Sequence, residues 1–139
     1  SAIHSESIRG KDVDYIGMIA LEMIGYYEGK PNSDKNRKEL FVSGIQKYAG
    51  YNKKISDLLK TPALLASRNF NLADDNRNNG PSDHRNYWDL GIPAAMIIGS
   101  GGNGNPNYHT EADTIETLDF ETMTKAVSSI AYMLLNFED

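Results

Sequence analysis

The most constraining feature of this sequence is a short apolar run that leads into a long segment unable to form regular structure. Residues 94–98, Ala-Ala-Met-Ile-Ile, predict a buried strand. The residues from 99 to 107 are mostly Gly, Asn and Pro, which interrupt helices and strands. This loop brings Tyr108 and His109 to a strand end. Because ligands bind beyond the carboxyl ends of strands in helix-covered sheets, we expect chemistry at this pair and interpret His109 as a zinc ligand.

A second apolar run, residues 15–24, is nearly continuous and is typical of a strand buried on both faces of an α/β sheet. Glu22 lies inside this run. A lone ionised carboxylate at such a position costs several kcal/mol unless it is paired or coordinated, so we expect Glu22 to have a partner. The alternative is that Glu22 ends the strand and reaches solvent past Gly25, and spacing alone does not separate the two interpretations.

The rest of the chain alternates between strand and helix signals. We expect strands over residues 39–45 and 64–72, a polar surface loop over 74–80, and one or two helical turns within 83–90. Apolar residues at helical spacing predict two longer helices. The first helix contains Tyr51, Ile55, Leu58 and Leu59, and it should end because Pro62 biases Thr61 away from helical geometry. The second helix is capped by Asp119. Its apolar residues are Met123, Ala126 or Val127, Ile130, Leu134 and Phe137.

Composition limits what the chain can bind. Its 139 residues suit one domain with one core. The net charge of −5 and the pI near 5.1 argue against a nucleic-acid surface, so we expect no nucleic-acid partner. With no cysteine, only His and carboxylates remain as strong metal ligands. No apolar run approaches the ~20 residues of a membrane span, and the first residues lack the features of a signal peptide.

Two familiar patterns fail in their context. Residues 99–104 spell Gly-x-Gly-x-x-Gly after a strand, but a dinucleotide-binding turn needs its last glycine to open a helix, and Asn-Pro-Asn follows here. A catalytic triad of Ser82, His84 and Asp113 is conceivable, yet Ser82 lacks the Gly-x-Ser-x-Gly elbow that exposes a nucleophile.

None of the three histidines has the i, i+4 partner of a helical zinc pair. We expect His4 to be a solvated surface residue. His84 is either a base or metal ligand, or a residue near a helix start bonded to backbone. His109 has Tyr108 and Thr110 beside it and Asp113 four residues later, which places a hydroxyl, an imidazole and a carboxylate within a short stretch of chain.

Three separated segments together resemble the second half of metallopeptidase family twenty-eight, the di-zinc aminopeptidases whose relatives include glutaminyl cyclases. They are residues 17–25 (Gly-Met-Ile-Ala-Leu-Glu-Met-Ile-Gly), residues 82–84 (Ser-Asp-His) leading into Gly-Ile-Pro-Ala at 91–94, and residues 108–114 (Tyr-His-Thr-Glu-Ala-Asp-Thr). The resemblance implies that Glu22 and His109 are metal ligands and that Tyr108 stabilises the oxyanion of the tetrahedral intermediate. Supporting positions around the metals would be Ser82, Asp83, His84, Thr110 and Asp113.

The remaining ligands of that family, a His, a bridging Asp and a Glu, lie upstream of the segment that residues 1–4 resemble, as does the Glu that acts as general base. Two ligands are too few for a catalytic zinc. We therefore expect residues 1–139 to be the C-terminal part of a single zinc-aminopeptidase catalytic domain. The implied fold is α/β, three layers of helix, sheet and helix with a mixed, mostly parallel sheet that lacks its N-terminal strands.

In the intact protein the resemblance implies a zinc-dependent exopeptidase with two zinc ions that hydrolyses N-terminal peptide bonds, while this chain alone should be inactive. One alternative is a glutaminyl cyclase-like acyltransferase, although such cyclases usually carry Trp where Tyr108 stands. The other is a non-catalytic binding or scaffold domain. We expect the missing half or a second copy to cover an exposed sheet edge. The residues do not indicate a compartment, and the family resemblance suggests export.

Overall fold

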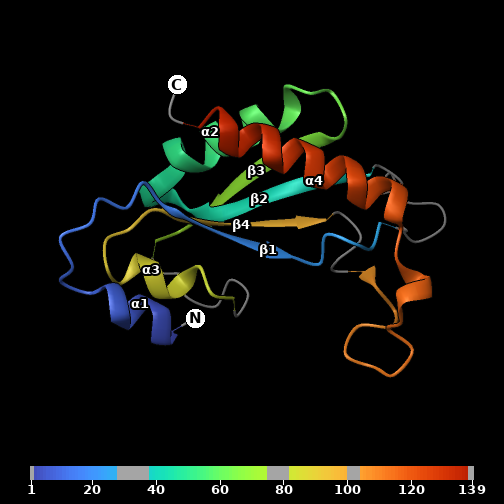
Figure 1. Cartoon of the computed structure of the whole chain (residues 1–139), viewed down its shortest axis with the longest axis horizontal. Helices are drawn as coiled ribbons and strands as arrows, with labels where there is room; N and C mark the ends of the chain where they lie inside the picture. The colour runs from blue at the N-terminus through green and yellow to red at the C-terminus, as the bar shows by residue number, and fades with distance from the viewer. Residues whose placement is uncertain (1, 28–37, 75–81, 100–103, 138–139) are drawn as a thin grey trace.

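A computed structural model describes residues 2–27, 38–74, 82–99 and 104–137 of the chain (Figure 1). Its helices are α1 Ala2–Ile8, α2 Ala49–Lys60, α3 Arg85–Trp88 and α4 Phe120–Leu135, with short 3₁₀ turns at η1 Gln46–Tyr48 and η3 Ile115–Thr117. Its strands are β1 Met18–Glu22, β2 Glu39–Ile45, β3 Ala66–Leu72 and β4 Ala94–Gly99. These strands form one four-stranded sheet in the order β1-β4-β2-β3.

The pairing of the strands decides which ends of the chain meet. β1 is parallel to β4 with Glu22 opposite Ile98, and β2 is parallel to β3. β4 and β2 are antiparallel, with Leu40 opposite Gly99. The carboxyl ends of β1 and β4 therefore lie together along one edge of the sheet, the edge formed by strand ends. The carboxyl ends of β2 and β3 lie along the opposite edge.

Helices cover both faces of this sheet, as the three-layer expectation requires. In Figure 1, α2 and α4 lie on one side and α1 and α3 on the other. The main core lies under α2 and α4 and includes Leu40, Val42, Ile55, Leu59, Ala95, Ile97, Ala126, Ile130 and Met133. A smaller cluster on the other face joins Ile8 of α1, Tyr87 of α3 and Ala94 of β4.

The N-terminus of α4 is held by the cap that the sequence predicts. The carboxylate of Asp119 accepts hydrogen bonds from Thr122 N at 2.9 Å and from Thr122 Oγ1 at 2.7 Å. Lys38 Nζ lies 2.7 Å from the same carboxylate. Bonds from Lys38 and Thr122 to the ionised form lower the pKa of Asp119 to about 2. The first turn of α4 is therefore anchored to the strand layer through a charged residue.

Most element predictions are confirmed, and two need correction. The strand over 39–45 has the expected bounds. The run 15–24 forms a strand only over Met18–Glu22, and this strand is not buried on both faces: among the described residues it lies at the edge of the sheet, with Leu21 exposed. Thr61 is not displaced from helical geometry: its φ is −59° and ψ −41°, and its N–H bonds Leu58 O at 3.2 Å. The hydrogen bond offsets the steric preference before Pro62, and the chain turns instead at Ala63, whose φ is 53°.

Parts of two sequence features, residues 75–80 of the polar loop and 100–103 of the glycine-rich segment, lie outside the described residues. Within the described ranges, no helix combines the length and the apolarity that crossing a membrane requires.

Candidate active site

Glu22 is the last residue of β1, and its side chain has the partner that its position calls for. Ser82 Oγ donates a hydrogen bond of 2.7 Å to Glu22 Oε1. Ser82 lies just before α3, on the same face of the sheet as Glu22. The bond compensates part of the cost of holding a half-buried carboxylate at the strand end and restricts its rotation. The two residues are 60 positions apart in the sequence, so only the fold brings them together.

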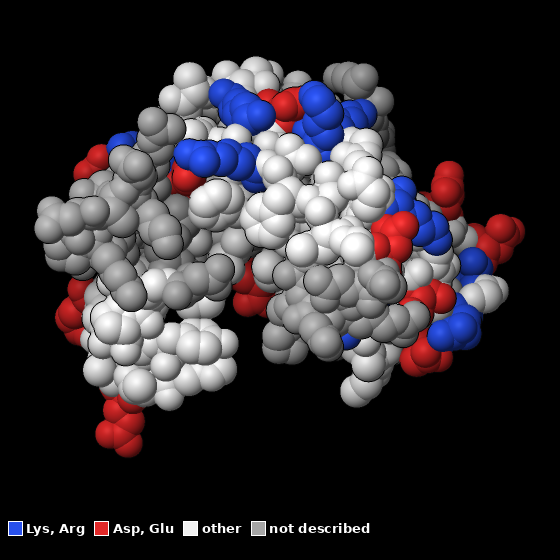
Figure 2. Space-filling view, turned by 180° about the vertical axis from the view of Figure 1, so that it is seen from behind, with Lys and Arg blue, Asp and Glu red and all other residues white. Residues whose placement is uncertain are grey.

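Tyr108 and His109 lie in the segment that connects β4 to α4. Their rings stack with centroids 3.8 Å apart and an interplanar angle of 19°. Both side chains are exposed, and His109 has a left-handed backbone with φ of 58°. In Figure 1 this orange segment extends away from the sheet, and in Figure 2 it forms a lobe at lower left with a notch between it and the main body. The imidazole is thus on a projecting loop and is accessible to a ligand.

Two residues predicted to support the site brace this loop. Thr110 Oγ1 donates to Asn107 O at 2.7 Å, and Asp113 Oδ1 accepts from Asn105 Nδ2 at 3.1 Å. Both bonds join residues on either side of the Tyr108–His109 pair. They shape the loop that presents the imidazole, while a direct role for either residue at a metal stays a prediction.

His84 is fully buried immediately before α3. Its ring meets Trp88 edge-on with centroids 4.9 Å apart, and neither ring nitrogen has a hydrogen-bond partner among the described residues. The expectation that His84 bonds backbone is therefore wrong, because the ring is packed inward against the indole. Burial, with a smaller contribution from Arg85, lowers the pKa of His84 to about 4 against opposing effects of Glu22 and Asp83. The imidazole is neutral at pH 7.

His4 is exposed as predicted but is not simply solvated. Its Nδ1 lies 2.5 Å from the hydroxyl of Tyr87, so it joins α1 to α3. Sequence reasoning missed this contact because no local pattern links residues 83 positions apart.

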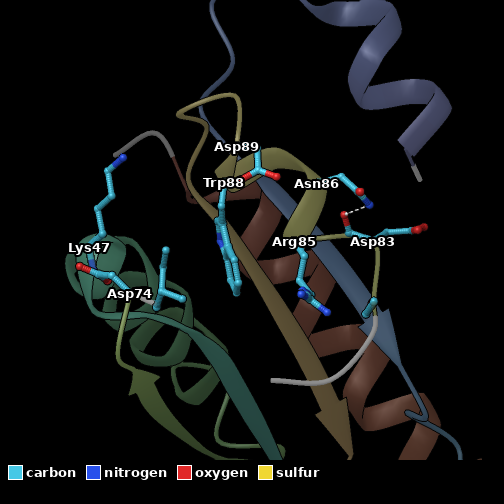
Figure 3. Close-up of a pocket in the computed structure, with 9 residues that line it drawn as sticks. Lys47, Asp74, Asp83, Arg85, Asn86, Trp88 and Asp89 are labelled. Carbon is cyan, nitrogen blue, oxygen red and sulfur yellow. Dashed lines mark hydrogen bonds between the residues drawn. The ribbon is translucent and has the colours of Figure 1, made fainter. Parts of the chain in front are cut away.

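A cavity of about 500 Å³ lies between α3 and the end of β2, and it is shown in Figure 3. The indole of Trp88 and the guanidinium of Arg85 lie on the same side of α3 there, whereas the side chain of Asp83 points to the other side. Ile45 and Lys47, which also line it, belong to the edge of the sheet opposite Glu22. Neither Glu22 nor His109 lines this cavity. Ser82, which bonds Glu22, does line it together with Asp83, so the cavity reaches the residues beside one candidate ligand.

The metal-binding capacity of the described residues is incomplete. No three His, Cys, Asp or Glu side chains converge anywhere in the described part of the chain. Glu22 and the loop bearing His109 do leave neighbouring parallel strands at the same edge of the sheet. A carboxylate and an imidazole are donors that zinc accepts, but a catalytic zinc normally has three protein ligands.

Comparison with solved structures first identifies the class of fold, that of an aminopeptidase. The LapA aminopeptidase of Legionella pneumophila matches 95% of this chain with a TM-score of 0.69 and 20% sequence identity. A second LapA structure matches 96% with a TM-score of 0.67 and 18% identity. At such identities the likeness shows the fold alone. This chain covers 33% and 35% of those two chains.

Sequence comparison then identifies the family. The model of peptidase family M28 matches residues 9–134, so the chain belongs to that family. The uncharacterized protein YfbL of Escherichia coli K12 is 32% identical over 149 residues, which cover 98% of this chain and 45% of YfbL. The chain thus spans less than half of this curated relative. The resemblance drawn from residues 17–25, 82–94 and 108–114 is confirmed at the level of family and fold.

Proposed function

We propose that this chain supplies part of the active site of a zinc-dependent aminopeptidase, in which Glu22 and His109 bind metal. The observation that supports this most directly is the pairing of β1 with β4. Because these strands are parallel and adjacent, Glu22 and the loop that bears His109 start from the same edge of the sheet. Ligands bind at that kind of edge in helix-covered sheets.

The chemistry of the donors suits zinc. Ser82 donates a hydrogen bond of 2.7 Å to one oxygen of the Glu22 carboxylate, which would hold this group in place while the other oxygen binds metal. The imidazole of His109 is accessible, and imidazole nitrogen and carboxylate oxygen are both donors that zinc accepts. A site of two zinc ions needs further ligands and a general base, and we propose that these come from another part of a longer protein.

The role that we propose for Tyr108 follows from its place beside His109. When bound, zinc would lower the pKa of a coordinated water to about neutrality. Tyr108 would donate a hydrogen bond to the oxyanion that forms at the scissile carbonyl, close to the metal because its ring stacks on that of His109. Removal of one such donor costs roughly a hundredfold or more in turnover.

Substitutions in the longer protein test these assignments separately. Glu22→Gln and His109→Ala should each lower the zinc content measured by elemental mass spectrometry, whereas His4→Ala should retain it. Tyr108→Phe should leave zinc content unchanged and reduce kcat on an aminoacyl-nitroanilide by about a hundredfold. Tyr132→Phe, in α4, is the matched control and should be fully active. Loss of zinc in Tyr108→Phe would refute the role given to the phenol.

The 139-residue chain by itself provides a further test. We expect it to retain almost no zinc after dialysis and to release no nitroaniline, since two protein ligands do not hold a catalytic zinc. Stoichiometric zinc that disappears in His109→Ala would mean that the chain or a second copy supplies the missing ligands. Turnover by the chain alone would overturn the proposal that its site is incomplete.

A further inference from the structure

Both ends of the loop that carries His109 contact the same short turn, residues 23–27, which follows Glu22. The first contact is at Gly99, where the loop leaves β4, and the second is at Asp119, where the loop enters α4. The turn therefore contacts the start and the end of a segment whose middle bears the second predicted ligand.

The first contact is a close approach between the backbone of Gly99 and that of Met23. A Cβ added to Gly99 would lie 2.8 Å from the carbonyl oxygen of Met23 and 3.2 Å from Cε1 of the Tyr27 ring. Real Cβ atoms do not approach a backbone oxygen so closely, and neither the carbonyl nor the buried ring can easily move. Only glycine fits at the end of β4 while Met23 keeps its present position.

The second contact consists of a hydrogen bond and an apolar contact. Asp119 N donates to Gly25 O at 2.8 Å. Leu118 packs against Gly25, where an added Cβ would lie 3.0 Å from Leu118 Cδ2. Because Asp119 also caps α4 through Thr122, the turn is joined to the capped first turn of that helix.

The turn itself has an unfavourable backbone. Met23 has φ of 48°, in the left-handed region that residues with a Cβ rarely adopt. Such a conformation persists only where surrounding contacts require it, and these conformations are concentrated at functional sites. Met23 directly follows Glu22, so its conformation sets the direction in which the chain leaves the predicted ligand.

We propose that the turn from Met23 to Tyr27 is a positioning element that sets the place of His109 relative to Glu22, with Gly99 and the backbone of Met23 as its determining residues. The metal-binding roles of Glu22 and His109 rest on the proposed function. The contacts between the turn and the two ends of the His109 loop do not depend on the proposed function, because they are made entirely within this chain.

Amide hydrogen exchange and NMR on the metal-free 139-residue protein test the link. In Gly99→Ala, the displaced Met23 carbonyl should weaken the bond from Asp119 N to Gly25 O and lower protection of the Asp119 amide at least tenfold. The ring-proton signals of His109 should shift as well. The interior amides of α4, such as Ile130, should keep their protection. Gly50→Ala is the control, because a Cβ there meets nothing within 4 Å.

Two substitutions at Met23 separate backbone conformation from side-chain packing. Met23→Gly retains the left-handed turn and should keep Asp119 protection within threefold of the wild type. Met23→Val disfavours that turn and should lower the protection at least tenfold. Equal losses in both variants would overturn the proposal, since the side chain and not the backbone would then hold the turn.

The outcomes also distinguish this inference from the proposed function. Unchanged Asp119 protection and His109 signals in Gly99→Ala would refute the positioning role, whatever the protein does with zinc. Equal loss of protection throughout α4 would refute it too, because the effect would be global unfolding. Failure of the longer protein to bind zinc would instead contradict the proposed function and leave the link between the segments intact.

Discussion

At the scale of single residues, His84 shows how burial changes the chemistry of a titratable side chain. The ring is fully buried against Trp88, and burial lowers its pKa to about 4. An unfolded histidine has a pKa near 6.5, so the unfolded state binds the proton more tightly than the native state. Protonation therefore favours unfolding as the pH falls from about 6.5 toward about 4.

This predicts a pH dependence that a single substitution should reduce. Between pH 7.5 and pH 4 the free energy of unfolding should fall by about 2 to 3 kcal/mol through His84. His84→Phe stays neutral and can still pack against Trp88, so it should show a flatter profile over that range. Urea denaturation at several pH values measures both proteins. The same slope in wild type and variant would show that other groups carry the pH dependence.

The residue scale also shows what the sequence could predict about the site. The expectation that Glu22 has a partner is confirmed by its bond to Ser82, although Glu22 also ends β1, as the alternative interpretation predicted. Spacing along the chain does not show which loop packs beside β1, so Ser82 was not predicted as this partner. The family resemblance implied only that Ser82 supports the metal site. The left-handed conformation of Met23 has no sequence signal of its own.

At the scale of elements, α2 packs on the sheet through a buried amide. Asn52 is fully buried and donates from Nδ2 to Asn71 Oδ1 at 2.6 Å and to Ile45 O at 3.3 Å. Gly44 faces this amide from β2, and an added Cβ would overlap it. The helix can approach the sheet this closely only because residue 44 has no side chain.

Substitutions of two glycines on these elements should have opposite effects on stability. Gly44→Ala should lower the free energy of unfolding by about 1 to 3 kcal/mol, because it overpacks the interface and strains the Asn52 hydrogen bonds. Gly50→Ala, in an open position of α2, should raise it by up to about 1 kcal/mol through helix propensity. Chemical denaturation compares the two. Equal stability of both variants would mean that α2 does not pack as described.

The boundaries of helices and strands were predicted best where the sequence has a clear apolar pattern or a capping residue. β2 has the expected bounds, and α4 begins directly after its Asp119 cap. β1 is shorter than its apolar run because the ladder with β4 starts only at Met18. The sequence shows which residues are apolar, whereas the paired strand determines how many of them form hydrogen bonds.

At the scale of the whole molecule, β1 forms an edge of the sheet in the part of the chain that the structure describes. Leu21 on β1 is 48% exposed, and Leu134 and Leu135 are exposed at the end of α4. A hollow of about 470 Å³ runs between Ile16 on the approach to β1 and these leucines. Apolar surface beside an edge strand favours association with another chain.

We therefore expect the 139-residue protein to self-associate as its concentration rises. Leu21→Lys should reduce association, because a charged side chain on an edge strand disfavours strand pairing. Leu64→Lys, at an exposed leucine outside β1, is the control and should associate like the wild type. Sedimentation velocity over a concentration series measures this. A wild-type protein that is monomeric throughout, or equal effects of both variants, would contradict the prediction.

The sequence by itself determined the class of fold, the family resemblance and the candidate ligands, because hydrophobic periodicity and short motifs depend on residues close together in the chain. Tertiary structure alone decided that β1 lies beside β4, that Ser82 holds Glu22, and that the turn after Glu22 contacts both ends of the His109 loop. These contacts join residues far apart in the sequence. They form only when the packing of helices on both faces of the sheet fixes the order and register of its strands.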